Sequence, residues 1–277
     1  MMNVCHELEL EYAKRLRASS RGERRRLYRE AYNAVSEAGA AAMPESVEQR
    51  TAGTSPALVQ SLIRLCEPSD RVLEVGCGRG YTCLNLASHV ASLVGMDVSD
   101  PALSEAQELL SRNGIANARL QRGFADELTS YFGTQAFDKV ISIDVYEHLH
   151  PEDAFVHLAE VLAVLRPGGE YIIVTPNRLT GPHDITRHLF PDAVEPLGFH
   201  LNETTSSQLL QALREVGFVG FHSVLPLSHK LPVPVDIVYP SVLDVFLEKQ
   251  YQRSRILSRV MRGLRLVGTV FLIAARP

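Results

Sequence analysis

Three glycines at alternating positions follow an acidic residue in one short stretch, Glu74-x-Gly76-x-Gly78-x-Gly80. Glycine lets a backbone approach a ligand closely, and a helix that begins here would direct its N-terminus at that ligand. The pattern differs from the G-x-G-x-x-G of dinucleotide-binding loops, because the third glycine comes one residue early. A carboxylate at Glu74 would also repel a pyrophosphate, whereas it would suit a ligand that carries an ammonium group.

A second acidic residue, Asp97, comes about twenty residues after the glycines and directly follows the predicted strand Ser92–Met96. In α/β folds an acid at this position accepts hydrogen bonds from the two hydroxyls of a ribose. A role in capping a helix or closing a turn is the alternative. The spacing from the glycine loop favours the ribose.

A third group of polar residues, Asp144-x-x-Glu147-His148, follows the predicted strand Phe137–Ile143. Two carboxylates and an imidazole supply the oxygen and nitrogen ligands that a divalent cation takes. The simpler interpretation is that His148 packs or caps after the strand. We favour this second interpretation, so we expect no metal.

Histidines recur after the predicted strand Tyr171–Val174, in a segment that also carries Asp184 and Arg187. Histidine is the usual general base near neutral pH, and loops after strands often hold catalytic groups. For any single one of these histidines a structural role is favoured over a catalytic one, and as a set on one loop they carry more weight. The set comprises His183, His188 and His200.

The elements that must position these residues alternate along the chain between short β-rich runs and helical patterns. Such alternation predicts an α/β fold with a parallel, doubly wound sheet. Ser55-Pro56 marks the start of the first core helix, with Ser as the cap and Pro in the first turn. The predicted strands cover 71–75, 92–96, 118–121, 137–143, 171–174, 218–224 and 267–274.

Composition excludes several classes of protein. The chain has 277 residues, of which 45% are hydrophobic and 22% are charged, which is ordinary for a globular protein. A net charge of -4 gives no reason to expect nucleic acid as a partner. The four cysteines form no CxxC pair, and we find neither a signal peptide nor a long apolar run. We therefore expect a cytoplasmic protein.

Four stretches, in the right order, resemble the motifs of the class I S-adenosylmethionine-dependent methyltransferases. The run Glu147-His148-Leu149 is similar to the branch that includes the ubiquinone-biosynthesis O-methyltransferases. The resemblance implies a Rossmann-like, doubly wound sheet of seven strands, mostly parallel with an antiparallel last strand. The four stretches are Val72–Gly80, Val94–Ser99, Phe137–Ser142 and Leu165–Gly169.

The resemblance also implies S-adenosyl-L-methionine as the cofactor and gives roles to individual residues. Glu74 and the glycine loop would hold the methionine part, and Asp97 the ribose. Asp126 would bind the adenine amino group between Phe124 and Ala125, although a helix cap is an alternative role for it. Asp144 would lie beneath the methionine part or the acceptor. We expect cofactor contacts at Glu74, Gly76, Cys77, Gly78, Gly80, Asp97, Val98, Phe124, Ala125, Asp126 and Asp144, and catalytic roles for His148, His183 and His188.

The expected activity is transfer of a methyl group to an oxygen, nitrogen or sulfur atom of a small-molecule acceptor. A nicotinamide-dependent oxidoreductase and a non-catalytic cofactor-binding regulator are the alternatives. Residues 1–54, basic and helical in pattern, are expected to form a lid, and Tyr28 and Tyr32 would face a ligand or the body. Residues 55–277 would form the methyltransferase domain, with a substrate-side insertion at 176–205 and a covering helix at 237–265. Contact of that basic helix with a membrane is possible in principle, but cover is favoured.

Overall fold

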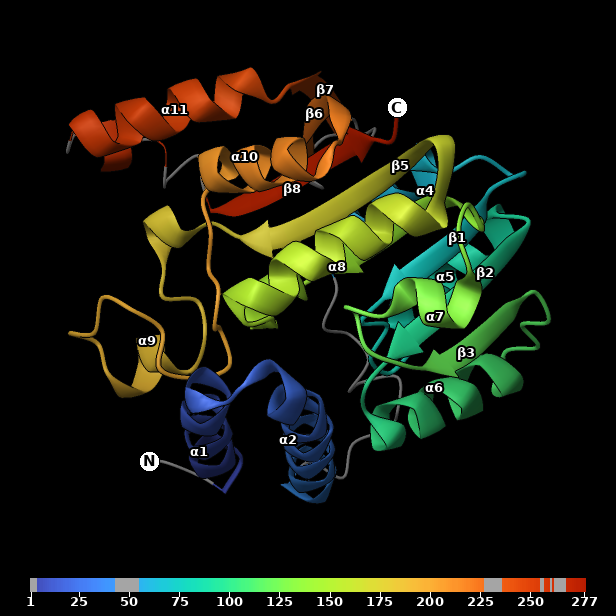
Figure 1. Ribbon diagram of the computed structural model, residues 1–277, viewed down its shortest axis with the longest axis horizontal. Coiled ribbons are helices and arrows are strands. Elements are labelled where there is room, and N and C mark those ends of the chain that lie inside the picture. The colour runs from blue at the N-terminus through green and yellow to red at the C-terminus, as the bar shows by residue number, and fades with distance from the viewer. Residues whose placement is uncertain (1–3, 43–54, 227–235, 255–256, 260, 262–267) are drawn as a thin grey trace.

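The computed structural model describes residues 4–42, 55–226, 236–254, 257–259, 261 and 268–277. A central sheet is covered on both faces by helices, and two further helices lie across one end (Figure 1). Helices α4, α5 and α6 cover one face, and α7, α8 and α10 cover the other. Within the described residues, no helix combines the length and the apolar character needed to cross a bilayer.

The sheet has eight strands in the described part of the chain, in the order β3-β2-β1-β4-β5-β8-β6-β7. Strands β1 to β5 pair in parallel, β8 runs antiparallel to β5 and β6, and β7 runs antiparallel to β6. The parallel strands therefore end at one edge of the sheet. The strands are β1 Arg71–Val75, β2 Ser92–Asp97, β3 Ala118–Arg122, β4 Phe137–Ile143, β5 Leu165–Pro176, β6 Val219–Pro226, β7 Asp236–Pro240 and β8 Thr269–Ala275.

The prediction of seven strands is wrong by one, because β7 adds an edge strand. Residues 236–240 read Asp-Ile-Val-Tyr-Pro, and their β-branched and aromatic side chains favour an extended backbone. Pro240 then prevents a helix from continuing through this segment. The predicted covering helix at 237–265 accordingly begins only at Val242, after Ser241.

Several helices begin where their capping residues predict. Ser55 accepts a hydrogen bond from the backbone N–H of Leu58, and Thr205 and Gln208 form a capping box. The helices are α1 Val4–Ala18, α2 Arg21–Ala42, α4 Pro56–Leu65, α5 Tyr81–Leu86, α6 Asp100–Arg112, α7 Leu128–Phe132, α8 Pro151–Val164, α9 Thr186–Leu189, α10 Ser206–Val216 and α11 Val242–Arg253. Short 3₁₀ turns cover 87–89, 146–148 and 178–180.

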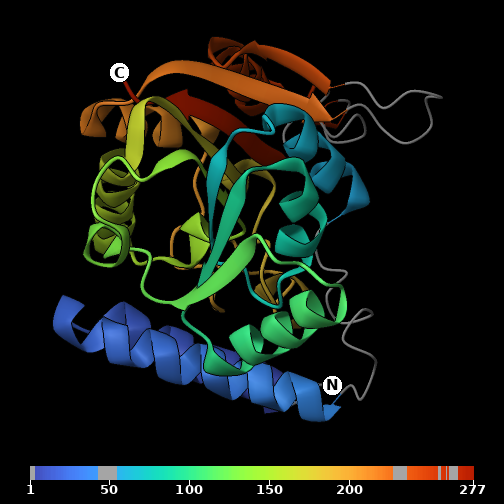
Figure 2. The same cartoon turned by 90° about the vertical axis from the view of Figure 1, so that its right-hand side faces the viewer.

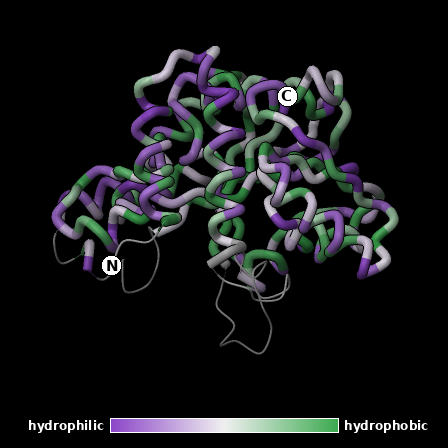
Figure 3. Tube along the Cα trace, turned by 90° about the horizontal axis from the view of Figure 1, so that it is seen from below, coloured by the Kyte–Doolittle hydropathy of each residue, from purple (hydrophilic) through white to green (hydrophobic). Residues whose placement is uncertain are grey.

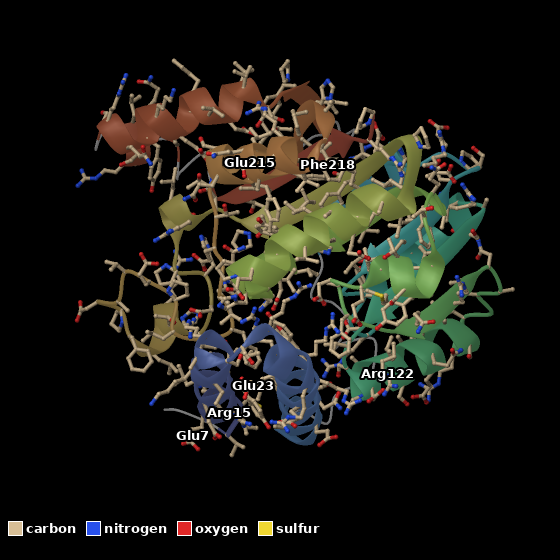
Figure 4. All side chains as sticks on the ribbon, in the orientation of Figure 1. Glu7, Arg15, Glu23, Arg122, Glu215 and Phe218 are labelled. Atoms are coloured by element: carbon tan, nitrogen blue, oxygen red, sulfur yellow. The ribbon has the colours of Figure 1, made fainter. Side chains whose placement is uncertain are left out.

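The N-terminal helices α1 and α2 form a hairpin that turns at Ser19 and Ser20, as the sequence predicts. The hairpin lies across the end of the sheet where the parallel strands finish (Figure 2). The two helices carry polar side chains such as those of Glu7, Arg15 and Glu23 (Figure 4). They lie apart from α10. We call residues 4–42 the helical hairpin.

Buried hydrophobic side chains form two large clusters in the body and a smaller one beneath the helical hairpin. Leu16, Leu27 and Ala31 of the hairpin pack against Phe199 from the segment after β5, with Val98 and Phe124 at the margin. Hydrophobic and hydrophilic residues alternate along the outer helices (Figure 3), as expected for elements with one face on a core. The hairpin is thus attached to the body by its own apolar contacts.

Candidate active site

The glycine loop connects β1 to α5, and its three glycines are needed for different reasons. Gly76 and Gly78 both have a positive φ, at 73° and 50°. A Cβ on Gly76 would lie 2.3 Å from Cγ2 of Val145, whereas a Cβ on Gly78 would meet nothing within 4 Å. Gly76 therefore allows a close approach of two loops, and Gly78 leaves space open beside the backbone.

Gly80 differs from the expectation for a cofactor contact. It begins α5 with φ 81°, and a Cβ there would lie 2.9 Å from the Cβ of Ala106 on α6. Two cavities, described below, lie at the ends of β1 and β2, and Gly80 is not among the described residues that line them. Its lack of a side chain serves helix packing and a left-handed backbone.

Asp97 ends β2 and fixes the glycine loop. The backbone N–H of Gly78 donates to its Oδ2 at 2.8 Å, and the backbone N–H of Ser99 donates to its Oδ1 at 2.9 Å. Burial raises the pKa of Asp97, although these N–H groups oppose the shift. Each carboxylate oxygen keeps a second lone pair for another donor. Asp97 can therefore hold the glycine loop and, at the same time, accept hydrogen bonds from a ligand.

Two cavities meet at this loop. The first, here the Phe124 cavity, encloses about 150 Å³ and is lined by Phe124, Ala125, Asp126, Val98 and His148, among others. The second, here the Glu74 cavity, encloses about 560 Å³ and is lined by Glu74, Cys77 and Gly78, among others. Both are also lined by Tyr32, Gly76 and Asp97. The two cavities therefore adjoin at the ends of β1 and β2, and we call them together the recess.

Glu74 is a buried carboxylate at one end of this recess. It is 3% exposed, and the Cys83 thiol donates to its Oε2 at 2.9 Å. Burial raises the pKa of Glu74 to about 7, and the groups that set this pKa among the described residues include no cation. A cationic ligand beside Glu74 would favour its charged form, because opposite charges stabilise each other most where water is excluded.

Asp126 lies at the other end of the recess, beneath α2. Its Oδ2 is 3.4 Å from Arg21 Nη2 and 3.6 Å from Arg25 Nη2. The N-cap of α7 is the next residue, Glu127, so the alternative role of Asp126 as a helix cap finds no support. The basic side chains of the hairpin thus contact the acidic residue that was expected to bind adenine.

A hydrogen-bond chain, which sequence reasoning missed, supports the Phe124 cavity from behind. His157 Nδ1 lies 2.9 Å from the carbonyl oxygen of Ala125, and its Nε2 lies 3.0 Å from the Tyr171 hydroxyl. Tyr171 in turn lies 2.7 Å from Ser142 Oγ. This buried chain fixes the loop after β3 against α8, β4 and β5.

An acid and histidine cluster follows β4. Asp144 has φ 51° and lines the Phe124 cavity with His148, while Glu147 is fully buried and accepts a hydrogen bond from Thr175 at 2.9 Å. Burial and the nearby His200 lower the pKa of His148 to about 3. His148 is therefore neutral at physiological pH.

His200 joins this cluster from the segment after β5. Its ring centroid lies 4.8 Å from that of His148, and its Nδ1 lies 2.7 Å from Glu203 Oε1. Burial alone would lower the pKa of His200, but the interaction with Glu203 raises it above the ordinary value. Sequence reasoning noted His200 but left it out of the catalytic set, although the i, i+3 spacing from Glu203 was a usable signal.

The cluster includes a set of potential metal ligands. Glu147, His148 and His200 each offer one ligand atom, and these atoms lie within 4.8 Å of one another. Oε1 of Glu147 is buried and has no hydrogen-bond partner among the described residues. The geometry permits a cation but is equally that of a buried polar cluster, so the expectation of no metal stays a prediction.

Two predicted catalytic histidines, His183 and His188, do not line either cavity within the described residues. His183 Nε2 lies 3.0 Å from both Thr180 Oγ1 and the carbonyl oxygen of Asn177, which ties it to its own loop. His188 is exposed on α9. Of the three predicted catalytic histidines, His148 lines the Phe124 cavity, and the roles of His183 and His188 stay predictions.

The comparisons with known proteins address the family. Residues 72–169 match a family model described as a methyltransferase domain. A protein of Mycolicibacterium smegmatis, named a probable S-adenosylmethionine-dependent methyltransferase, is 31% identical over 160 residues, which are 57% of this chain and 55% of that protein. The matched segment is a class I S-adenosylmethionine-dependent methyltransferase domain. The chain spans about half the length of the curated relatives that it matches.

Solved structures of methyltransferases share the fold of this domain. YcgJ of Bacillus subtilis aligns with a TM-score of 0.53 at 16% identity, over 79% of this chain and 97% of that chain. Phosphoethanolamine N-methyltransferase 2 of Haemonchus contortus, solved with S-adenosyl-L-methionine, aligns with a TM-score of 0.55 at 16% identity, over 83% and 56% of the two chains. At these identities the likeness shows the fold alone.

Proposed function

We propose that the protein transfers the methyl group of S-adenosyl-L-methionine to an oxygen, nitrogen or sulfur atom of a small-molecule acceptor. One observation carries the proposal: Gly76 and Asp97 line both of two adjoining cavities, of which one is lined by the buried carboxylate Glu74 and the other by Asp126. Of these acids, Glu74 suits a cationic group and Asp97 suits hydroxyl groups, whereas Asp126 is already paired with Arg21 and Arg25. The acids do not suit the phosphates of a nicotinamide dinucleotide.

The residues present fit this cofactor. The main causes of the Glu74 pKa among the described residues include no cation, and Asp97 retains lone pairs for two ribose hydroxyls. Phe124 and Ala125 offer apolar surface for an adenine ring, with Asp126 beside them. Gly78 leaves open the space that a side chain would fill. Cys77 and Val98 complete the proposed cofactor contacts.

The bound cofactor would supply a methyl group on a positively charged sulfur, which leaves as a neutral thioether. The protein must therefore mainly align the acceptor and exclude water. His148 is suited to aligning the acceptor, because the contact of its Nδ1 with the carbonyl oxygen of Phe199, at 3.2 Å, fixes the orientation of the ring. An N–H at Nδ1 would leave Nε2 as a hydrogen-bond acceptor for the acceptor's O–H or N–H group.

A proton released by the acceptor needs a carboxylate or imidazole of suitable pKa. Asp144 borders the Phe124 cavity, and burial raises its pKa, although His200 and His183 oppose the shift. A raised pKa brings a carboxylate closer to the range in which it accepts a proton at neutral pH. We therefore propose Asp144 and His148 as the groups that contact the acceptor.

The proposed lid is the N-terminal segment 1–54, of which residues 4–42 form the helical hairpin. Tyr28 and Tyr32 of α2 line the Phe124 cavity, and the Tyr32 ring centroid lies 5.1 Å from that of Phe199. The hairpin thereby bridges the cofactor loops and the proposed substrate-side insertion at 176–205. The domain proper would be 55–277, and the acceptor would enter between hairpin and insertion.

Calorimetry with S-adenosylmethionine, S-adenosylhomocysteine and NAD tests the cofactor. Binding of the first two without NAD is expected, and the reverse would favour a nicotinamide-dependent oxidoreductase. A panel of small hydroxyl, amine and thiol acceptors with methyl-labelled cofactor then tests the transfer. Cofactor binding without transfer to any acceptor, including those in a cell extract, would instead favour a non-catalytic regulator.

A further inference from the structure

Helix α11 packs with a charged residue inward. In the described part of the helix, the buried residue is Glu248, whose side chain is 3% exposed. Its carboxylate accepts hydrogen bonds from the backbone N–H groups of Ser206 at 2.5 Å and Ser207 at 3.0 Å, and from Asn177 Nδ2 at 3.1 Å. The N-terminus of α10 favours a negative charge, so this contact fixes which face of α11 points inward.

The other acid of α11 is also directed at the protein. Asp244 accepts hydrogen bonds from the Tyr239 hydroxyl at 2.7 Å and from Ser223 Oγ. Both negative charges of the helix are thus used in contacts within the chain. The face that remains carries no acid among the described residues 242–253.

That outer face is apolar. Val242, Leu243 and Phe246 are 64%, 48% and 57% exposed, and their i, i+3 and i+4 spacing puts them on one side of the helix. Ile237 of the edge strand β7 is 44% exposed and shares a sheet face with Tyr239, which donates a hydrogen bond to Asp244 of α11. The helix lies along the outer margin of the molecule, far from the helical hairpin (Figure 1).

This concentration of exposed apolar side chains is unusual for a covering helix. The described residues include twelve exposed large hydrophobic side chains, and six of them fall between residues 237 and 257. Single exposed hydrophobic residues need no explanation, but a cluster of them marks an interaction surface. The exposed side chains of Phe246 and Leu257 are not those of a helix whose outer face is purely polar.

The same segment is strongly basic in a chain of net charge -4. Residues 249–265 contain no aspartate or glutamate. Of the basic residues that the structure describes here, Lys249, Arg253 and Arg259 are exposed. The sequence of this segment carries Lys249, Arg253, Arg255, Arg259, Arg262 and Arg265.

We propose that β7 and α11 form a peripheral membrane-binding surface for anionic lipid, with Ile237, Val242, Leu243 and Phe246 entering the interface. Exposed apolar side chains beside a cluster of cations are the combination that an anionic bilayer surface binds. A second copy of the chain fits less well, because two such surfaces would bring their own cations together.

Cosedimentation with lipid vesicles tests this proposal on the full chain. We expect binding to vesicles of phosphatidylglycerol and phosphatidylcholine, weaker binding to phosphatidylcholine alone, and weakening of the first by salt. The double variant Leu243→Ser/Phe246→Ser should lower the apparent affinity at least tenfold. The matched control, Phe155→Ser/Val194→Ser, removes exposed apolar side chains on other elements and should bind as the parent does.

Two measurements keep the result interpretable. Circular dichroism and cofactor affinity should be unchanged in the double variant, since its side chains are exposed and distant from the recess. Sedimentation without vesicles should give a monomer for both proteins. Failure of the parent protein to bind anionic vesicles, equal binding by the double variant, or a dimer that only the double variant loses would each overturn the proposal.

Discussion

The buried guanidinium of Arg24 on α2 donates two hydrogen bonds to the carboxylate of Asp153 in the first turn of α8. Nε lies 2.6 Å from Oδ2 and Nη2 lies 3.1 Å from Oδ1, and Arg24 is 1% exposed. The Tyr28 hydroxyl lies 3.2 Å from the same carboxylate and accepts a hydrogen bond from the backbone N–H of His150. This contact fastens the helical hairpin to the wall of the recess.

Removing Arg24 tests whether the hairpin depends on this contact. Arg24→Ala leaves the buried carboxylate of Asp153 without its main partner, which costs about 3–5 kcal/mol of unfolding free energy. Urea unfolding measures this loss, and limited proteolysis should cut residues 4–42 sooner. Arg26→Ala is the control, because Arg26 is 68% exposed and pairs on the surface with Glu30. Equal stability of the two variants would contradict this role.

Asp97→Ala should weaken cofactor binding without unfolding the protein. Hydrogen bonds to a charged group contribute roughly 1.5–3 kcal/mol each, so losing two lowers affinity by a factor of tens or more. The backbone N–H groups of Gly78 and Ser99 also lose their acceptor, so a modest fall in stability is expected. Calorimetry with S-adenosylhomocysteine measures the affinity, with Asp100→Ala, an exposed acid nearby, as control. Unchanged affinity would disprove the ribose assignment.

Substitutions at Gly78 and Gly80 should have different effects. Gly78→Val places a branched side chain in the open space beside the loop, so cofactor binding and activity should be lost. Gly80→Ala presses on Ala106, so we expect a loss of stability of about 1–3 kcal/mol. Thermal melts and cofactor titrations on both variants make the comparison. A stable, fully active Gly78→Val protein would rule out the loop assignment.

The raised pKa of Glu74 makes cofactor binding depend on pH. The folded-state pKa is about 7 against an ordinary 4.5, so the folded protein without cofactor holds an extra proton between these values. The protonated Glu74 therefore adds to the free energy of unfolding below about pH 4.5. This addition is lost as pH rises from about 4.5 to 7, and it stays lost at higher pH. A bound ammonium favours the carboxylate, so cofactor binding should release a proton, and affinity should rise about tenfold from pH 5.5 to 7.5.

Glu74→Gln provides the control for this pH dependence. The variant has no titrating group at this position, so its cofactor affinity should be lower at pH 7.5 and nearly flat across the same range. Calorimetry in two buffers of different ionisation enthalpy measures the released proton directly. A parent protein with flat affinity and no proton release would show that Glu74 does not contact a cationic group of the cofactor.

Turnover is expected to be independent of metal, once an acceptor is known. Thr175 donates a hydrogen bond to Glu147, and His200 Nδ1 lies 2.7 Å from Glu203 Oε1, so these groups have partners within the protein. A chelator should leave the rate unchanged, and added magnesium should have no effect. Loss of turnover with the chelator, its recovery with magnesium and sensitivity to His148→Ala would together identify Glu147, His148 and His200 as metal ligands.

Local patterns in the sequence determined most of the fold. The strand Arg71–Val75, the glycine loop after it and Asp97 at the end of β2 could be predicted, because strand propensity, turn residues and helix caps act between neighbours in the chain. The edge strand β7 was missed, since its five residues give a weak signal at the start of the predicted helix 237–265, and its pairing with β6 is a contact between separate segments.

Only the tertiary structure decided which polar residues meet. Arg24 forms an ion pair with Asp153, 129 residues away in sequence, and the ring of His148 packs against that of His200, 52 residues away. No local spacing encodes these contacts. Packing likewise excluded His188 from the recess and turned Glu248 of α11 inward, which left Phe246 outside. Such choices depend on the combined burial of many side chains, in which one buried charge with good partners outweighs the amphipathic pattern of a single helix.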